Sequence, residues 1–371
     1  MRFLIINTDY PEFIRDDYAR HAGLVKQSFA SQLEHRYDTL FGTANFYSKN
    51  LRDLGHEAID LFANHEYIQR QWAKDHNVAP EKNKRKWFRS KSLSNEWMEN
   101  ILAAQIAWYE PDVLYIMAME AMRPEFLLTI KSQFYRLKIV GQHAALLTDN
   151  MRNLSGYDLV LSSLPNQVDY FRAKDVKSHL FRLGFEASIL NLLPKTKKKY
   201  GAIHIGGYGP VHNERSVVLE KLAAEIPVDF WGYGEENLKP SSEILKSFHG
   251  FVGGKQMYEI LQQSQLTMTK HIKRVAGTHA NNMTLYEATG VGTLLLVDER
   301  SDLDQIFEPE KEVVVYRNAA ELIEKTKYYL SHPADNKRIA QAGQARTLKD
   351  HSYKKRMREL VAILNEELWG T

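Results

Sequence analysis

One carboxylate, Glu287, has the sequence context of a nucleotide-binding side chain. It lies in the segment 282–298, where Gly290 and Gly292 follow it. A carboxylate one or two turns into a helix can accept hydrogen bonds from both ribose hydroxyls, while free amides at the helix start face the diphosphate. Each such bond contributes about 1.5 to 3 kcal/mol when it is kept from water. The alternative is that Glu287 is only a first-turn residue favoured by the helix dipole.

Gly206 and Gly207 follow a short apolar run and precede a helical segment that begins near residue 213 and contains Arg215. Glycines after a strand let a phosphate approach the backbone before it reaches the amides of residues 213–216. The glycine spacing differs from the dinucleotide fingerprint, and no acidic residue follows at the proper distance, which disfavours an NAD enzyme. A tight turn without a ligand is the alternative interpretation.

The diphosphate of a bound nucleotide carries negative charge, so the site needs cations. The loop after the apolar run 265–269 contains several, which we rank as Lys270 first, then Arg274 and Lys273. We expect the protein to neutralise this charge itself, without a metal site or another cofactor. A solvated basic loop is the alternative interpretation.

Polar side chains in the first half of the chain could face the second substrate. His143 ends the run 140–143, and as a proton acceptor or hydrogen-bond donor it is the first catalytic candidate. Asp149 is a second candidate base, and Asp9, after the first apolar run, is a weaker third. A lone histidine at a strand end is more often structural.

Apolar runs that alternate with helical patterns predict the elements that position these residues. In the first half we expect strands at 3–6, 57–62, 112–117, 137–140, 159–162 and 179–183. Apolar residues at three and four spacing predict helices at 46–54, 96–109, 125–134 and 167–173. This alternation indicates a parallel sheet wrapped by helices.

The pattern restarts after a short basic connector. We expect a first domain at residues 1–192, a linker at 193–199, a second domain at 200–352 and a final helix at 353–371. Strands are predicted at 200–205, 228–231 and 265–269, and helices at 213–224, 255–262, 319–330 and 334–348. The fold class is therefore α/β, with two domains built on parallel sheets.

The composition agrees with a folded, reduced protein. The 371 residues include no cysteine, and 44% are hydrophobic and 26% charged, so disulfides and a cysteine nucleophile are excluded. A net charge of +3 is too small to indicate a nucleic-acid partner. The first apolar run is too short for a signal peptide, and we expect a cytoplasmic protein.

Basic and aromatic residues mix between Lys82 and Arg89. Such a segment could contact an anionic membrane surface peripherally or bind an acidic acceptor. The alternative is a solvated loop.

Four matches in order make the C-terminal half similar to the group 1 glycosyltransferases, and most of all to the spore-maturation CgeB-like branch. They are Tyr286-Glu287-Ala288 with its glycines, Asp298 with the run 303–307, the run 313–316, and the run 340–343 with His351-Ser352-Tyr353 and Arg356. The resemblance implies the GT-B architecture: two facing Rossmann-like domains, with the last helix crossing back to the first.

The resemblance also implies residue roles. It places Glu287 on the ribose, with Asn282, Met283 and Thr284 beside the nucleotide. Family members carry an acidic residue eight positions before this glutamate, where it touches the donor sugar. His279 stands at this position here and is a catalytic candidate that could hydrogen-bond a sugar hydroxyl. Many members of the CgeB-like branch carry an arginine at the position of Thr284. A histidine such as His143 faces the transferred sugar.

The function implied is metal-independent transfer of a sugar from a nucleoside diphosphate sugar to an unknown acceptor in the interdomain cleft, with retention of configuration. Two alternatives stay open. The replacements at His279 and Thr284 favour a catalytically inert protein that binds a sugar nucleotide or a surface-layer glycan. A sugar-nucleotide epimerase has the same architecture but needs further carboxylates in the cleft.

Overall fold

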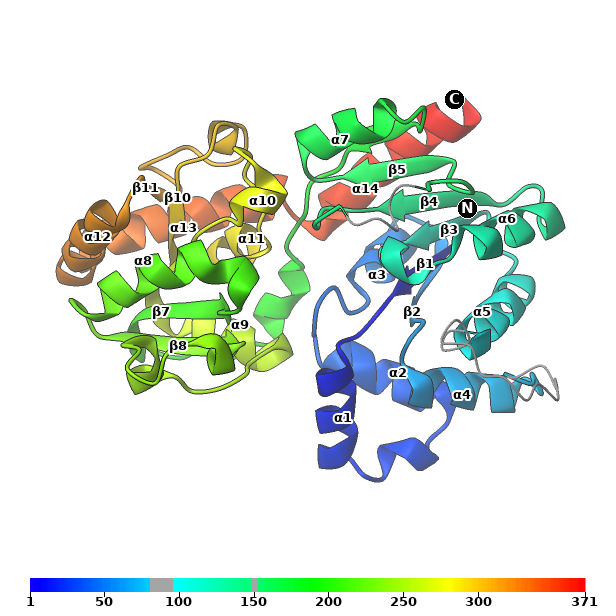
Figure 1. The fold of residues 1–371 in the computed structure, drawn as a ribbon, viewed down its shortest axis with the longest axis horizontal. Helices are drawn as coiled ribbons and strands as arrows, with labels where there is room; N and C mark the ends of the chain where they lie inside the picture. The colour runs from blue at the N-terminus through cyan, green and yellow to red at the C-terminus, as the bar shows by residue number, and fades with distance from the viewer. Residues whose placement is uncertain (81–95, 148–152, 371) are drawn as a thin grey trace.

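The chain folds into two α/β lobes that lie side by side (Figure 1). The computed structural model describes residues 1–80, 96–147 and 153–370. Each lobe is built around a parallel sheet, one of six strands and one of five. The predicted class, with two parallel-sheet domains, is confirmed.

The first sheet has the strand order β2-β1-β3-β4-β5-β6. Its inner strands β1, β3 and β5 are short, largely apolar runs that are buried on both faces, as parallel sheets covered by helices require. Residues 3–6 of β1, for example, are all buried between β2 and β3. The strands are β1 (Arg2–Asn7), β2 (Glu57–Phe62), β3 (Val113–Ile116), β4 (Lys138–Gln142), β5 (Leu159–Ser162) and β6 (Ser178–Leu180).

Helices cover both faces of this sheet. Three of them, α1, α2 and α4, were not predicted from the sequence. The helices are α1 (Pro11–Arg20), α2 (Phe29–Asp38), α3 (Phe46–Asp53), α4 (Glu66–Asp75), α5 (Glu96–Tyr109), α6 (Pro124–Gln133) and α7 (Pro165–Arg172). The basic segment from Lys82 to Arg89 lies outside the described residues.

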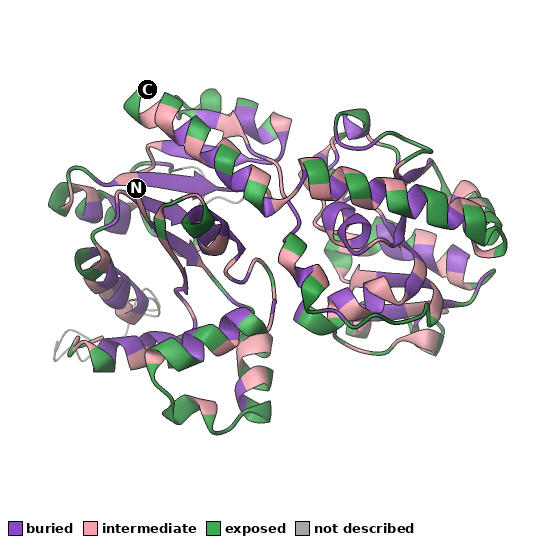
Figure 2. Ribbon diagram, turned by 180° about the vertical axis from the view of Figure 1, so that it is seen from behind, coloured by how far each residue is buried: buried purple, intermediate pink, exposed green. Residues whose placement is uncertain are grey.

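The second sheet has the order β11-β10-β9-β7-β8. Its strands are β7 (Tyr200–Gly207), β8 (Val228–Tyr233), β9 (Ser264–Thr269), β10 (Leu294–Asp298) and β11 (Val314–Tyr316). Its helices are α8 (Asn213–Ala223), α9 (Gly254–Gln262), α10 (Lys273–Ala276), α11 (Thr284–Gly290), α12 (Ala319–Ser331) and α13 (Pro333–Asp350). Figure 2 shows both sheets largely buried, with exposed residues on the outer sides of the helices. None of the described helices is both long and apolar enough to span a bilayer.

The last helix, α14 (Tyr353–Leu364), crosses back onto the first domain, as predicted (Figure 1). The chain enters it through a short parallel bridge, in which Phe185 N donates to His351 O at 2.8 Å and Tyr353 N donates to Phe185 O at 2.9 Å. Arg356 Nε then donates to Leu183 O at 2.8 Å. The C-terminal run around His351 and Tyr353 is therefore a structural clamp between the lobes.

A second contact joins the lobes on the other side of the junction. Lys255 N, at the start of α9, donates to Thr39 O of the first domain at 2.9 Å. Gly254 has a φ of +57°, and a Cβ there would lie 2.1 Å from Thr39 O. Only glycine allows this close approach.

We expect Gly254→Ala to destabilise the protein by more than the roughly 1 to 2 kcal/mol that a left-handed backbone alone costs, because it also breaks the contact with Thr39. Thermal unfolding measures the loss. The matched control is Gly250→Ala: Gly250 also has a positive φ, of 87°, but has open space around it. Equal losses in the two variants would show that the contact between the lobes contributes little.

Candidate functional site

A cavity of about 960 Å³ lies between the lobes, at the carboxyl ends of both sheets. This is where parallel α/β sheets bind ligands. The first domain contributes residues after β1 and β4, and the second contributes the end of β7, the start of α8 and the turn that leads into α11. Lining residues from the first domain include Asp9, Arg36, Thr43 and Glu120, and those from the second include Gly206, Gly207, His212, Arg215, Asn282, Met283, Thr284 and Glu287.

Glu287 lies in the first turn of α11 and lines the cavity. Among the described residues its carboxylate has no hydrogen bond and no ion pair. Burial raises the pKa of Glu287 to about 7. Glu287 is half-buried, and a partly buried acidic group without a partner is costly for folding, so such groups are enriched at functional sites.

Asn282 holds the turn before Glu287 in place. Its Oδ1 accepts a hydrogen bond from Thr284 N at 2.9 Å, and its Nδ2 donates to Thr269 Oγ1, at the end of β9, at 2.7 Å. Met283 and Thr284 line the cavity between Asn282 and Glu287. The structure thus brings together the four neighbouring residues that the resemblance places at the nucleotide.

Gly206 and Gly207 line the cavity, but they do not form the loop that the sequence suggested. They are the last residues of β7 and pair with Gly232 and Tyr233 of β8. The missing side chain of Gly206 makes room for a cation, because a Cβ there would lie 2.9 Å from an Arg215 guanidinium nitrogen. Gly206 therefore lets Arg215 lie against the strand end.

Arg215 supplies a buried positive charge to the cavity. It lies in the first turn of α8, whose start has no side-chain cap but follows directly on the 3-10 turn Pro210–His212, so that Asn213 N already donates to Pro210 O. Its guanidinium contacts His212 Nδ1, and no carboxylate in the described part of the chain pairs with it. Burial lowers the pKa of Arg215, yet an arginine stays charged in proteins.

The two histidines beside Arg215 do not add charge. Burial and the nearby Arg215 lower the pKa of His204 to about 3 and that of His212 to about 4. Both rings are therefore neutral near pH 7. Arg215, at the start of α8, forms the electropositive end of the cleft.

Lys270 and Arg274, which the sequence ranked first, are not among the residues that line the cavity. Lys270 Nζ lies 4.0 Å from Asp298 Oδ2, and Arg274 is exposed. Although burial alone would raise it, the pKa of Asp298 falls to about 2 because His271 and Arg300 donate to this carboxylate. Asp298 thus anchors the loop, and the structure brings neither Lys270 nor Arg274 to the wall of the cleft.

His279 is also absent from the cavity lining. Its Nδ1 lies 3.6 Å from Asp302 Oδ2, on the side of the loop that faces Arg182. The geometry gives no support to a catalytic role for His279. The chain contains one Asp-x-Asp pair in this region, Asp302 and Asp304, but neither lines the cleft.

His143 lies one layer behind the cavity wall. It follows β4 and is buried, and its Nδ1 lies 3.0 Å from Gln167 Oε1. Its Nε2 has no hydrogen bond but lies 3.6 Å from Glu120 Oε1. Glu120 itself lines the cavity, and 48% of its side chain is exposed. Asp149 lies outside the described residues.

Asp9 also lines the cavity, but it is not a free base. Arg36 binds it through two bonds, from Nε to Oδ2 at 2.9 Å and from the second terminal nitrogen to Oδ1 at 2.6 Å. Arg36 is buried, and its guanidinium lies 4.0 Å from the centre of the Phe62 ring. The pair fixes the loop after β1, so the candidate role of Asp9 as a base is not supported.

Sequence reasoning missed Glu120 and Arg36. Glu120 follows the end of β3 by four residues, and the rule that polar residues after parallel strands gather at one sheet edge would have found it. Arg36 gave no such signal, because it belongs to a helix that had not been predicted.

Residues 215–362 match the family model described as glycosyl transferase-like. No curated protein matches the sequence significantly. The matched part of the chain includes both Arg215 and Glu287.

Solved structures share the fold over nearly the whole chain. Anabaena Alr3699/HepE in complex with UDP-glucose is 12% identical with a TM-score of 0.63, covering 99% of this chain and 100% of that one. A glycosyltransferase from Rickettsia africae is 13% identical with a TM-score of 0.60, covering 100% and 99%. A putative UDP-N-acetylglucosamine 2-epimerase from Listeria monocytogenes is 12% identical with a TM-score of 0.55, covering 100% and 97%. At such identities the likeness shows the fold, and the predicted GT-B type is confirmed.

Proposed function

We propose that this protein is a glycosyltransferase that takes a sugar from a nucleoside diphosphate sugar and transfers it to an acceptor bound against the first domain. The glycosyl transferase-like match and the GT-B fold support a nucleotide-sugar-dependent transferase. The observation that carries the proposal is that one cleft holds both a carboxylate without a hydrogen bond or ion pair and a buried arginine that no carboxylate in the described part of the chain pairs with.

The donor side of the site follows from these two groups. The Glu287 carboxylate accepts hydrogen bonds from the ribose hydroxyls, and Arg215 binds the diphosphate. When the bond between the sugar C1 and the diphosphate oxygen breaks, its electron pair leaves with the nucleoside diphosphate. Arg215 stabilises this charge, which supports a metal-independent reaction. The UDP ligand of Anabaena HepE makes a UDP-sugar the first donor to test.

The acceptor side of the site is built around Glu120. Its carboxylate faces the cavity and accepts a hydrogen bond from a hydroxyl at the reacting centre, while His143 behind it fixes its position. His143 is thus a positioning residue in this proposal. In a retaining transfer the acceptor hydroxyl approaches on the face that the diphosphate leaves, and a diphosphate oxygen takes its proton. Retention and the CgeB-like branch rest on the sequence resemblance.

Incubation with a panel of nucleoside diphosphate sugars tests the proposal. We expect slow release of the nucleoside diphosphate from one donor even without an acceptor, because water can replace it. Binding without release would instead support the inert binding protein. Conversion of the bound sugar nucleotide into its epimer would instead support the epimerase alternative. The putative epimerase from Listeria monocytogenes shares this fold.

We expect Glu120→Gln to lower the rate of donor turnover roughly tenfold or more, because the amide cannot replace the charged acceptor at the reacting centre. The affinity for UDP should stay within about twofold, since Glu120 lies on the opposite wall from Arg215. Steady-state rates and calorimetry measure the two effects. The matched control is Glu125→Gln, an exposed glutamate outside the cleft. A loss of UDP affinity in Glu120→Gln would contradict this assignment.

A further inference from the structure

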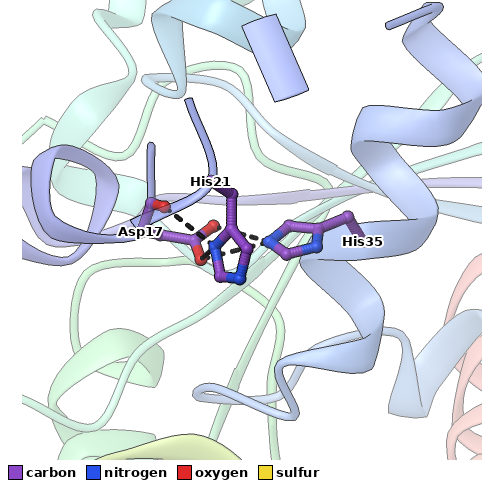
Figure 3. Close-up of side chains that lie close together, drawn as sticks. All are labelled: Asp17, His21 and His35. Atoms are coloured by element: carbon purple, nitrogen blue, oxygen red, sulfur yellow. Dashed lines mark hydrogen bonds and ion pairs between the residues drawn. The ribbon is translucent and has the colours of Figure 1, made fainter. Parts of the chain in front are cut away.

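Three metal-ligating side chains converge on the outer side of the first domain, where α1 meets α2 (Figure 3). Asp17 lies near the end of α1, His21 directly follows that helix, and His35 lies in α2. His35 Nε2 lies 3.0 Å from Asp17 Oδ2, and His21 Nδ1 lies 3.1 Å from Asp17 Oδ1. Neither histidine nor Asp17 lines the interdomain cavity.

The spacing of these atoms is close to that of a metal coordination shell. One ligand atom from each residue lies within 4.8 Å of the other two. Ligands at the Zn–N and Zn–O distances of about 2.0 to 2.2 Å in a tetrahedral site are separated by roughly 3.4 Å. An ion between the three atoms therefore requires only small rotations of the side chains, without movement of either helix.

We propose that Asp17, His21 and His35 bind a divalent transition-metal ion. Two imidazoles and one carboxylate suit Zn²⁺ and its neighbours, whereas Mg²⁺ and Ca²⁺ prefer oxygen ligands alone. The Asp17 side chain is 9% exposed and that of His21 is 52% exposed. The ion thus rests on a nearly buried carboxylate and remains open to water on one side, where solvent completes its coordination.

The position of the site suggests what the ion does. The chain between His21 and His35 includes a short 3-10 turn, Leu24–Lys26, and the ion closes this segment into a loop. Arg36, next to His35, binds Asp9 at the wall of the cleft. The ion therefore holds α1 against α2 and stabilises the helix pair behind the acceptor side, without contacting the donor.

Titration of the full chain, without a histidine tag, with Zn²⁺ tests the proposal. We expect one saturable site by calorimetry, a visible absorption band when Co²⁺ replaces Zn²⁺, and no binding of Mg²⁺. Zinc should raise the melting temperature by about 3 °C or more at saturation. His35→Ala and Asp17→Asn should each weaken zinc binding at least roughly tenfold.

The matched control is His249→Ala in the second domain. His249 Nε2 also lies close to a carboxylate, 2.7 Å from Asp229 Oδ1. In the described part of the chain, however, no third metal-ligating side chain joins this pair. This variant should bind zinc as the wild type does. Absence of a one-to-one site, or equal binding by His35→Ala and the wild type, would overturn the proposal and leave the three residues as a hydrogen-bonded cluster. Nucleotide binding is measured separately, so either result is independent of the proposed transferase activity.

Discussion

Glu287→Ala is expected to weaken the binding of a UDP-sugar roughly tenfold or more, a loss of about 1.4 kcal/mol or above. The carboxylate lines the cleft without a protein partner, so it is free to accept hydrogen bonds from both ribose hydroxyls. Uridine should lose affinity by a similar factor, because the contact involves only the nucleoside. Calorimetry with UDP-glucose and with uridine measures both losses.

The pH dependence of binding gives this prediction a second measurement. Burial raises the pKa of Glu287 to about 7, so the ionised form that accepts these hydrogen bonds is lost as the pH falls. We expect affinity for UDP-glucose to fall up to roughly tenfold between about pH 8 and about pH 6. UDP-glucose is preferable to UDP here, because a terminal phosphate titrates near pH 6. Glu287→Gln should bind weakly with no such dependence.

The same variant separates binding from folding. Because the folded pKa of Glu287 is raised, the folded state holds the proton more tightly than the unfolded state, and stability is lost as the pH rises through about 7. Glu287→Gln removes that loss and should stabilise the apo protein on the order of 2 kcal/mol near pH 8, with no gain near pH 4. A variant that is destabilised at every pH, or that keeps its affinity, would contradict the ribose assignment.

The sequence predicted those elements whose burial pattern is regular. The strands at 57–62 and 159–162 and the helix at 96–109 were predicted with the bounds that the structure shows. The strand at 159–162 is buried throughout, the strand at 57–62 is buried over its last three residues, and the helix at 96–109 buries residues spaced three and four apart. Because the residues of each element determine which of its side chains are buried, local periodicity is enough to predict the element.

The helices α1 and α2 were missed because their buried faces are not apolar. In α1 the only buried residue is Tyr18, and in α2 the buried positions include the polar Gln32 and Arg36. These side chains are buried because distant residues satisfy them: Tyr18 Oη donates to Gln32 Oε1 at 2.5 Å, and Arg36 binds Asp9. Such pairing depends on tertiary structure, and no periodic pattern in one segment reveals it.

Only part of the donor site could be predicted, again because some of its contacts depend on tertiary structure. Glu287 and its neighbours follow one another in the chain, so their shared position in the cleft follows from one turn and one helix. The identity of the cation could not be predicted in this way, because it depends on which of several strand ends faces the cavity. The loop at Lys270 has more positive charge, but Asp298 binds that loop, whereas Arg215 is directed to the cleft by the absence of a side chain at Gly206.

Arg215→Ala is expected to weaken the binding of UDP by roughly tenfold to a hundredfold, since a hydrogen bond to a charged group contributes about 1.5 to 3 kcal/mol. The affinity for uridine should not change, because uridine has no phosphate. This difference separates the arginine from Glu287, whose loss weakens both ligands. Calorimetry with the two ligands on both variants gives the comparison.

The apo protein should tolerate this change. Arg215 is buried and has no carboxylate partner among residues 1–80, 96–147 and 153–370, so its removal relieves a desolvation cost and should not lower the melting temperature. Arg274→Ala is the matched control, because Arg274 is an exposed cation that does not line the cavity. If Arg274→Ala weakened UDP binding and Arg215→Ala did not, the diphosphate would lie against the loop after β9, and the electropositive end assigned to α8 would be wrong.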